Sequence, residues 1–376
     1  MNGIPEGIFL ARPERPGEGI PLAVKDLFDT AGLTTTYGSA IFADHVPSST
    51  ATAVRVLEDA GYTNVGKTNL HEFAYGVTSE NPHYGTVPNP IAPGRIAGGS
   101  SGGSAAALAG GFADAALGTD SGGSIRIPAA CCGIVGFKPT YGLVPLDGCF
   151  PLASSFDHAG PMARTVEACE AMLVALAPNY EPLELDSLAD LTVAVAWLEH
   201  SEPLVRVRVE EATRFFDHRR PVEIPYPQAA DSLFMREVAD VHRDLYAEHR
   251  DLYGEEVAAR IERCLDVSDA EASASARFRD EYRESALGLL AGAQLLLTPT
   301  LRRVAPPAGE GQRDELVRFT YPINVLGWPA LALPCGPAED GLPASIQIVG
   351  KPGSDNLVLA AGRLLESLVR GTPERG

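Results

Sequence analysis

The stretch from Gly98 to Gly142 constrains the fold more than any other part of the chain. It contains two clusters of serine and glycine, Gly98 to Ser104 and Ser121 to Ser124, with a small-residue helix and a short strand predicted between them. Backbone N–H groups in such glycine turns can converge on an anion or on a carbonyl oxygen. Serine and glycine repeats are more often linkers, but apolar segments flank both clusters, which favours an ordered structure.

Composition limits what the chain can bind. Its 376 residues are 45% hydrophobic, enough to bury a large core, and segments with helical and strand patterns alternate, which predicts an α/β fold. We expect a single domain over residues 1–376. The formal net charge of -19 argues against direct binding to nucleic acid or to an anionic membrane, because both need a positive surface.

The chain has the composition of a cytoplasmic protein. Its first residues lack the pattern of a secretory signal, and no apolar run approaches the ~18–20 residues of a membrane span. The cysteines show neither C-x-x-C spacing nor the density of a disulfide scaffold, so we expect reduced, mostly buried thiols. These cysteines are Cys131, Cys132, Cys149, Cys169, Cys264 and Cys335.

Short strands and helices alternate through the first half of the chain. One strand, over 20–24, is bounded by Gly and Pro and places Lys25 at its tip. The segment from His71 to Pro90 is rich in Asn, Pro and Gly, and we interpret it as a surface loop. We further expect strands at 62–66 and 113–117, and helices at 49–61, capped by Ser49 or Thr50, at 103–109 and at 165–176.

The second half contains a helical segment between strands. Residues from about 200 to 290 are poor in Gly, with apolar residues at helical spacing, and we expect a helical insertion there. Its aromatic residues Phe234, Tyr246 and Tyr253 are predicted to be core. Strand patterns without polar alternation are typical of strands covered on both faces, and they occur at 191–196, 294–298, 330–334 and 344–349, before a final helix at 354–369 capped by Ser354.

Several residues could support nucleophilic catalysis. Asp157 and His158 invite a Ser-His-Asp interpretation, but adjacent residues rarely face each other as a triad requires, so a turn role for Asp157 is favoured. Cys131 and Cys132 have apolar neighbours, and buried thiols are inert. Lys25 offers an alternative base, because burial at a strand tip lowers the pKa of a lysine and lets it accept a proton.

Several further segments carry a family resemblance. The runs Gly98 to Ser104 and Gly118 to Arg126 are accompanied, in order, by GIPLAVKD around Lys25, GKTNLHEFA at 66–74, GFKPTYGLVP at 136–145, DHAGPMART at 157–165, LLTPT at 296–300 and GLPASIQIVG at 341–350. With these segments the chain resembles the amidase signature family of serine amidohydrolases, which includes the A subunits of glutamyl-tRNA amidotransferases. The resemblance covers about 20–175 and 290–370. It implies a large mixed, mostly parallel sheet covered by helices on both faces.

The resemblance also implies a site. It assigns Lys25 as the base, Ser100, in an unusual cis peptide, as the bridging residue, and Ser124 as the nucleophile. The backbone N–H groups of Ser121, Gly122, Gly123 and Ser124 would form the oxyanion hole. The implied reaction hydrolyses a small amide through an acyl-enzyme to a carboxylate and ammonia or an amine, and it requires neither a metal ion nor a cofactor.

The resemblance is incomplete at the start and in the middle of the chain. Family members carry several tens of helical residues before the lysine strand, whereas Lys25 comes almost at once, and the middle is abbreviated. We therefore expect a more open pocket. The sequence leaves open whether the chain forms a homodimer. Two alternatives remain: a glutaminase subunit of a tRNA-dependent amidotransferase, which would need a tRNA-binding partner, and a non-catalytic interaction protein on the same fold.

Overall fold

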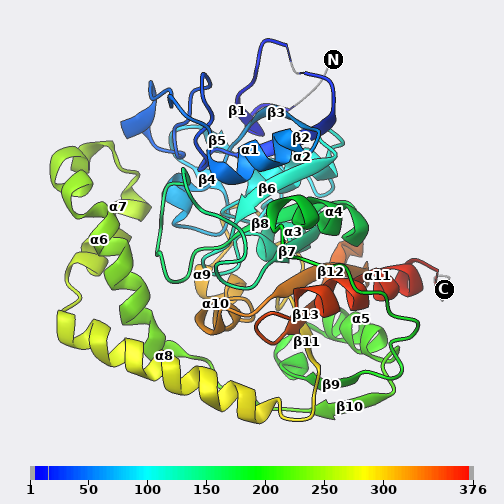
Figure 1. The fold of residues 1–376 in the computed structure, drawn as a ribbon. Helices are drawn as coiled ribbons and strands as arrows, with labels where there is room; N and C mark the ends of the chain where they lie inside the picture. The colour runs from blue at the N-terminus through cyan, green and yellow to red at the C-terminus, as the bar shows by residue number, and fades with distance from the viewer. Residues whose placement is uncertain (1–4, 16, 372–376) are drawn as a thin grey trace.

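A single large sheet runs through the molecule (Figure 1). The computed structural model describes residues 5–15 and 17–371. The sheet has 11 strands in the order β1-β3-β2-β6-β8-β7-β12-β13-β11-β9-β10. The strands are β1 (Phe9–Ala11), β2 (Ile20–Lys25), β3 (Tyr62–Thr68), β6 (Ala115–Thr119), β7 (Val135–Lys138), β8 (Ala159–Ala163), β9 (Thr192–Val195), β10 (His218–Pro221), β11 (Leu295–Pro299), β12 (Ala330–Pro337) and β13 (Pro343–Gly350). A separate pair joins β4 (Glu80–Asn81) to β5 (Gly85–Thr86).

The sheet is mixed, and parallel pairing lies toward its two ends. At one end β2 pairs in parallel with β3 and β6, and at the other β9 pairs in parallel with β10 and β11. The central strands β8, β7, β12 and β13 pair with their neighbours in antiparallel fashion, as does β1 with β3. The parallel strands β2 and β6 end side by side, which brings Lys25 and Thr119 to the same edge.

Helices cover both faces of the sheet, as the α/β interpretation expects (Figure 1). One face is covered by α1 (Thr52–Asp59), α4 (Val166–Leu176), α5 (Pro203–Thr213) and α11 (Asp355–Gly371). The other face is covered by α2 (Gly102–Ala109) and α3 (Arg126–Cys132). The remaining helices share an apolar cluster with α3: α6 (Asp231–His249), α7 (Glu255–Leu265), α8 (Asp269–Leu289), α9 (Arg313–Leu316) and α10 (Tyr321–Leu326). Short 3-10 turns lie at Ala40–Phe42, Glu72–Ala74, Leu198–His200, Gln228–Ala230, Arg250–Leu252 and Glu339–Gly341.

The alternation along β2 decides where its lysine points. Leu22 and Val24 belong to the apolar layer beneath α1 and α4, whereas Ala23 belongs to the layer beneath α2. Successive side chains of a strand point to opposite faces, so Lys25 shares the face of Ala23. Its side chain therefore reaches the start of α2, where the first serine cluster lies.

Most of the expected elements of the first half are confirmed, with two corrections. The helix expected at 49–61 begins at Thr52 with Ala51 as its N-cap and no side-chain cap, because the Thr50 hydroxyl accepts a hydrogen bond from the Ala31 amide instead. The prediction that His71 to Pro90 is a surface loop is wrong over its first part. Glu72 is fully buried, and its carboxylate accepts hydrogen bonds from Ser39 Oγ at 2.8 Å and from the Gly254 amide at 2.9 Å.

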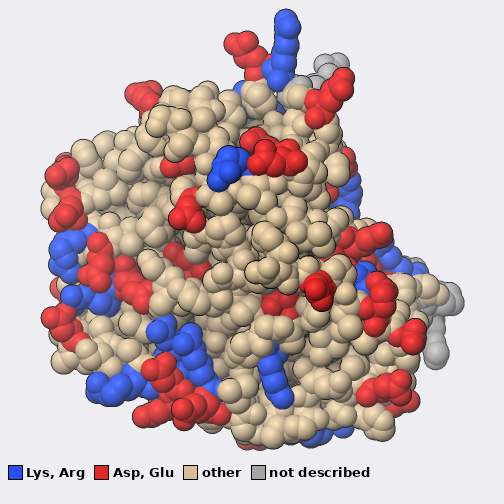
Figure 2. Space-filling model, viewed as in Figure 1, with Lys and Arg blue, Asp and Glu red and all other residues tan. Residues whose placement is uncertain are grey.

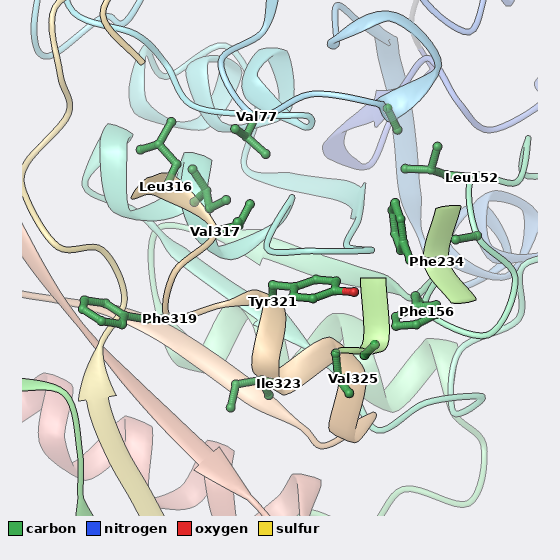
Figure 3. Packing of buried hydrophobic residues seen from close by; sticks show 14 of the residues in the cluster. Val77, Leu152, Phe156, Phe234, Leu316, Val317, Phe319, Tyr321, Ile323 and Val325 are labelled. Atoms are coloured by element: carbon green, nitrogen blue, oxygen red, sulfur yellow. The ribbon is translucent and has the colours of Figure 1, made fainter. Parts of the chain in front are cut away.

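The helical middle packs through aromatic side chains against α10 and against the loops that carry Phe73 and Phe156. Phe234, Tyr246 and Tyr253 are buried, which confirms their predicted core role. Figure 3 shows the Tyr321 ring between Phe319 on one side and Phe156 and Phe234 on the other. The rings of Phe156 and Tyr321 stack with centroids 6.2 Å apart. Within the helical segment, α8 begins with a complete capping box at Ser268, and the assignment of one domain with an insertion at about 200–290 stays a prediction.

The distribution of surface charge and the state of the cysteines can be compared with the expectations from composition. On the face in Figure 2, basic residues are interspersed with acidic ones. All six cysteines lie within the described residues, and none forms a disulfide. Within the same residues, no helix is long and apolar enough to cross a membrane.

Candidate active site

Lys25 lies at the centre of the candidate site. Its side chain is fully buried, and Nζ lies 2.6 Å from Ser100 Oγ and 2.6 Å from Thr119 Oγ1. Both partners are uncharged hydroxyls. Burial disfavours the charged ammonium and lowers the pKa of Lys25 to about 7, with the more distant Cys149, Asp120 and Asp157 opposing the shift. A lysine in this setting holds a neutral amine over much of the physiological range, so it can accept a proton.

Ser100 is held between the lysine and the loop after β3. The Gly99–Ser100 peptide bond is cis, as the resemblance implies. The Ser100 carbonyl oxygen accepts hydrogen bonds from the His71 amide at 3.2 Å and from Ser79 Oγ at 3.3 Å. A Cβ at Gly103 would lie 2.3 Å from the carbonyl oxygen of Asn69, so the start of α2 needs glycine to approach this loop. The burial of the His71 loop, which sequence reasoning missed, thus supports the backbone of Ser100.

Ser124 lies in the second turn, two residues before α3 begins at Arg126, and is buried. Its carbonyl oxygen accepts a hydrogen bond from the amide of Ser101 at 3.2 Å. This contact joins the two serine clusters, which are far apart in the sequence, through the residue next to Ser100. The structure therefore brings Lys25, Ser100 and the turn that carries Ser124 into one region.

The turn before Ser124 presents backbone N–H groups. The amides of Ser121, Gly122 and Ser124 donate no hydrogen bond to the residues described. The Gly123 amide differs, because it donates to Asp120 Oδ1 at 2.7 Å. Gly123 has a φ of +128°, and a Cβ there would lie 2.2 Å from Thr320 Oγ1, so only glycine fits. Three of the four sequence-predicted oxyanion donors are thus unpaired.

A buried ion pair holds this turn in shape. Arg126 donates to both carboxylate oxygens of Asp120, from Nε at 3.0 Å and from Nη2 at 2.9 Å. The Asp120 carboxylate also accepts from the amides of Gly123 and Ile125. The charge of Arg126 outweighs burial and holds the pKa of Asp120 well below its usual range. Asn324 belongs to the same hydrogen-bond network: its Nδ2 donates to Asp120, and its Oδ1 accepts from Arg126.

Asp157 secures the other side of the turn. Its carboxylate accepts hydrogen bonds from Ser121 Oγ at 2.6 Å and from the amides of Leu152 and Ala153. Burial raises the pKa of Asp157 to about 6. His158 Nδ1 is directed to the carbonyl oxygens of Phe156, at 2.7 Å, and Asp120. This geometry agrees with the expected turn role of Asp157 and provides no Ser-His-Asp triad.

Two cavities lie near the turn, and their linings share no residue. Cavity A, about 360 Å³, is lined by aromatic and charged residues that include Tyr75, Tyr321, Arg260 and Arg313. It meets the turn through Tyr321, whose ring carbon Cδ2 is 3.7 Å from a Cβ position at Gly122. Cavity B, about 150 Å³, is lined by Thr119 and Ser121 together with apolar residues that include Leu27, Leu146, Phe150 and Leu152.

Other candidate chemistries find no support in the geometry. Cys131 and Cys132 are buried, and burial raises the pKa of the Cys131 thiol to about 12, which keeps it protonated. No group of three or more His, Cys, Asp or Glu is placed to hold a metal ion in the part of the chain that the structure describes.

Known proteins share both the sequence and the fold. A family model named Amidase matches residues 9–190 and 178–359. The chain belongs to the amidase family. Membership confirms the expected family, the α/β fold and the enzyme class, a hydrolase of amide C–N bonds.

Individual relatives are similar over almost the whole chain. The A subunit of glutamyl-tRNA(Gln) amidotransferase from Natronomonas pharaonis is 33% identical and that from Picosynechococcus sp. is 36% identical; each alignment covers 93% of this chain, and 96% and 84% of the relatives. A solved amidase structure is 37% identical with a TM-score of 0.85, over 93% of this chain and 84% of that one. The solved structure of the same amidotransferase component from Thermotoga maritima is 28% identical with a TM-score of 0.81, over 98% and 88%.

Sequence reasoning missed the supporting residues of this candidate site. Thr119 ends β6 beside β2, and the signal was present, because parallel neighbouring strands end at the same edge of a sheet. Asn324 and Thr320 gave no such signal. Thr320 Oγ1 donates to the Gly122 carbonyl oxygen at 2.7 Å from a position 198 residues away in the sequence.

Proposed function

We propose that this chain hydrolyses small amides with Ser124 as nucleophile, Ser100 as proton relay and Lys25 as base. The observation that carries the proposal is the buried Lys25 amine, whose pKa is about 7 and whose near neighbours are hydroxyls. A neutral amine can take a proton from Ser100 Oγ, and Ser100 can take one from Ser124. General base catalysis of this kind contributes about 10²–10⁴-fold.

The turn amides complete the proposed mechanism. As Ser124 Oγ attacks the carbonyl carbon, negative charge develops on oxygen, and the unpaired amides of Ser121, Gly122 and Ser124 are available to bind it. One such donor is worth about 3–4 kcal/mol. As the intermediate collapses, the C–N bond breaks and the leaving nitrogen takes, through Ser100, the proton that Lys25 accepted. Water then hydrolyses the acyl-enzyme along the same relay.

The proposed setting is the cytoplasm, with a free small molecule as substrate and the whole chain acting as one catalytic unit. Six cysteines without a disulfide suit a reducing compartment. The net charge of -19 suits neither tRNA nor an anionic membrane as a direct ligand. Cavity A, with charged and aromatic walls, suits the acyl part of a polar amide.

The direct test replaces the nucleophile. Ser124→Ala should abolish hydrolysis across a panel of aliphatic, aromatic, peptide and urea-type amides, while its thermal unfolding matches that of the unaltered chain. A matched control is Ser367→Ala, an exposed serine of α11 that lines neither cavity, which should retain turnover. Full activity of the Ser124 variant would falsify the assignment.

A glutaminase component of a larger enzyme is the second candidate, favoured by the similarity to the A subunits of amidotransferases. Turnover of simple amides by the purified chain alone supports the stand-alone amidase. Hydrolysis of glutamine only, and only in the presence of a partner protein, supports the second candidate.

A further inference from the structure

Cavity B is placed to receive one particular part of an amide substrate. It is a compartment of about 150 Å³ beside the turn, and its walls include Thr119 and Ser121. Thr119 Oγ1 is 2.6 Å from Lys25 Nζ, which is itself 2.6 Å from Ser100 Oγ. Cavity B therefore reaches the oxyanion turn through Ser121, and through Thr119 it is one side chain away from Lys25. The lining of cavity A includes neither Thr119 nor Ser121 and meets the turn through Tyr321.

The way in which the C–N bond breaks indicates which cavity binds the leaving amine and which binds the acyl group. On the proposed mechanism, the tetrahedral intermediate collapses as the C–N bond breaks and its electron pair stays on nitrogen. That nitrogen takes the proton of Ser100 Oγ, which Lys25 Nζ replaces. The leaving nitrogen must therefore face the relay, and a substituent on it extends toward the relay side of the site. The acyl carbon chain extends away from the relay, and cavity A, which approaches the turn at Tyr321, is the other cavity available to it.

The walls of cavity B define the substituent it can accept. Leu27, Leu146, Phe150 and Leu152 give it an apolar lining. Asp157 is its one acidic residue among those described, and the Asp157 carboxylate already accepts hydrogen bonds from Ser121 Oγ and two loop amides. No lysine or arginine lines it within the described residues. A cavity of about 150 Å³ with apolar walls holds a group of roughly benzene size.

We infer that this chain hydrolyses secondary amides whose leaving amine carries an uncharged, apolar group of no more than roughly six heavy atoms, bound in cavity B. The inference rests on the proposed function and deepens it. Its products are a carboxylate and a primary amine such as aniline, instead of ammonia alone.

The test compares two substrates with the same acyl group, propionamide and propionanilide, in three proteins. Leu146 lines cavity B, whereas Leu143 is a half-buried leucine on the same loop and does not line it. Leu146→Trp should lower the ratio of kcat/KM for propionanilide to that for propionamide about tenfold or more, because the new ring fills the cavity. Leu143→Trp should leave that ratio within about twofold.

A second variant tests the opposite direction. Leu146→Ala enlarges cavity B and should raise kcat/KM for N-(1-naphthyl)propionamide relative to propionanilide. The inference is overturned if Leu146→Trp discriminates against benzamide over propionamide instead, because cavity B would then bind the acyl group. It is also overturned, with the proposed function intact, if the unaltered chain hydrolyses propionamide and not propionanilide. Failure with every amide in the panel would overturn the proposed function and this inference together.

Discussion

Two buried lysines on neighbouring strands have different partners, a carboxylate in one case and hydroxyls in the other. Lys25 ends β2, and Lys67 lies opposite Val24 on β3. Both side chains have no solvent exposure. Lys67 Nζ lies 2.9 Å from Asp26 Oδ1 and donates to the Phe28 carbonyl oxygen and to Thr35 Oγ1. Lys25 is hydrogen-bonded to two hydroxyls, and it forms no ion pair with a carboxylate within residues 5–15 and 17–371.

The comparison shows that partner chemistry, rather than burial, separates a structural lysine from a candidate catalytic one. Burial lowers the pKa of both groups, but the Asp26 carboxylate opposes that shift directly at Lys67. Lys67 with Asp26 ties β3 to the segment after β2. Lys25, with only hydroxyl groups beside it, can exchange a proton with Ser100.

The largest expected effect comes from removing the amine of Lys25. Lys25→Met should lower kcat/KM by about 10²–10⁴-fold, the contribution of a general base. Its unfolding temperature should not fall, because the partners left behind are neutral hydroxyls. Steady-state kinetics together with circular dichroism melts measure the two properties. Equal turnover by the variant would remove Lys25 from the mechanism.

Lys67→Met should act on stability instead. It leaves the buried Asp26 carboxylate without its cation, and breaking a buried pair in this way costs about 3–5 kcal/mol. Chemical denaturation would show a lower midpoint. The double variant Lys67→Met with Asp26→Asn serves as the control and should recover part of the loss. A Lys67 variant with unchanged stability and lost turnover would erase the distinction between the two lysines.

The pH dependence of hydrolysis should follow Lys25. The amine must be neutral to act as a base, and its pKa is about 7, so kcat/KM should fall about tenfold per pH unit below 7 and level off above it. Asp157, with a pKa of about 6, titrates on the same limb. Asp157→Asn separates the two groups, and because the Asp157 carboxylate raises the pKa of Lys25, its removal should move the midpoint somewhat below 7. Activity that is flat from pH 5 to 9 would contradict a lysine base.

The smallest effect is expected at Thr119. Thr119→Val keeps the shape of the side chain and removes one hydrogen-bond partner of Lys25 Nζ, so kcat/KM should fall by about 2–10-fold, the value of a single hydrogen bond. A hydroxyl stabilises the ammonium more than the amine, and its loss should therefore shift the acidic limb to lower pH. Ser154→Val, which also alters the wall of cavity B, is the control. A shift to higher pH would contradict this interpretation of the Thr119 contact.

Local signals predicted the candidate site better than they predicted its support. The apolar run before Lys25 gives a strand, and serine and glycine clusters give turns, because these depend on nearby residues. The Asp120 carboxylate also accepts a hydrogen bond from Asn324, which lies in α10, far away in the sequence. The His71 loop has a polar sequence, yet Glu72 is buried because Ser39, His83 and Gly254 supply its hydrogen bonds. Such partners follow from tertiary packing and have no local sequence signal.

The most direct measurement is the titration of Lys25 itself. The sequence holds only four lysines, at 25, 67, 138 and 351, so the Cε signals of 13C-labelled lysine can be resolved by NMR and assigned with Lys25→Met. The account predicts that the Lys25 signal titrates with a midpoint near pH 7. A Lys25 signal that stays in its protonated position up to about pH 10, the range of an ordinary lysine, would contradict it.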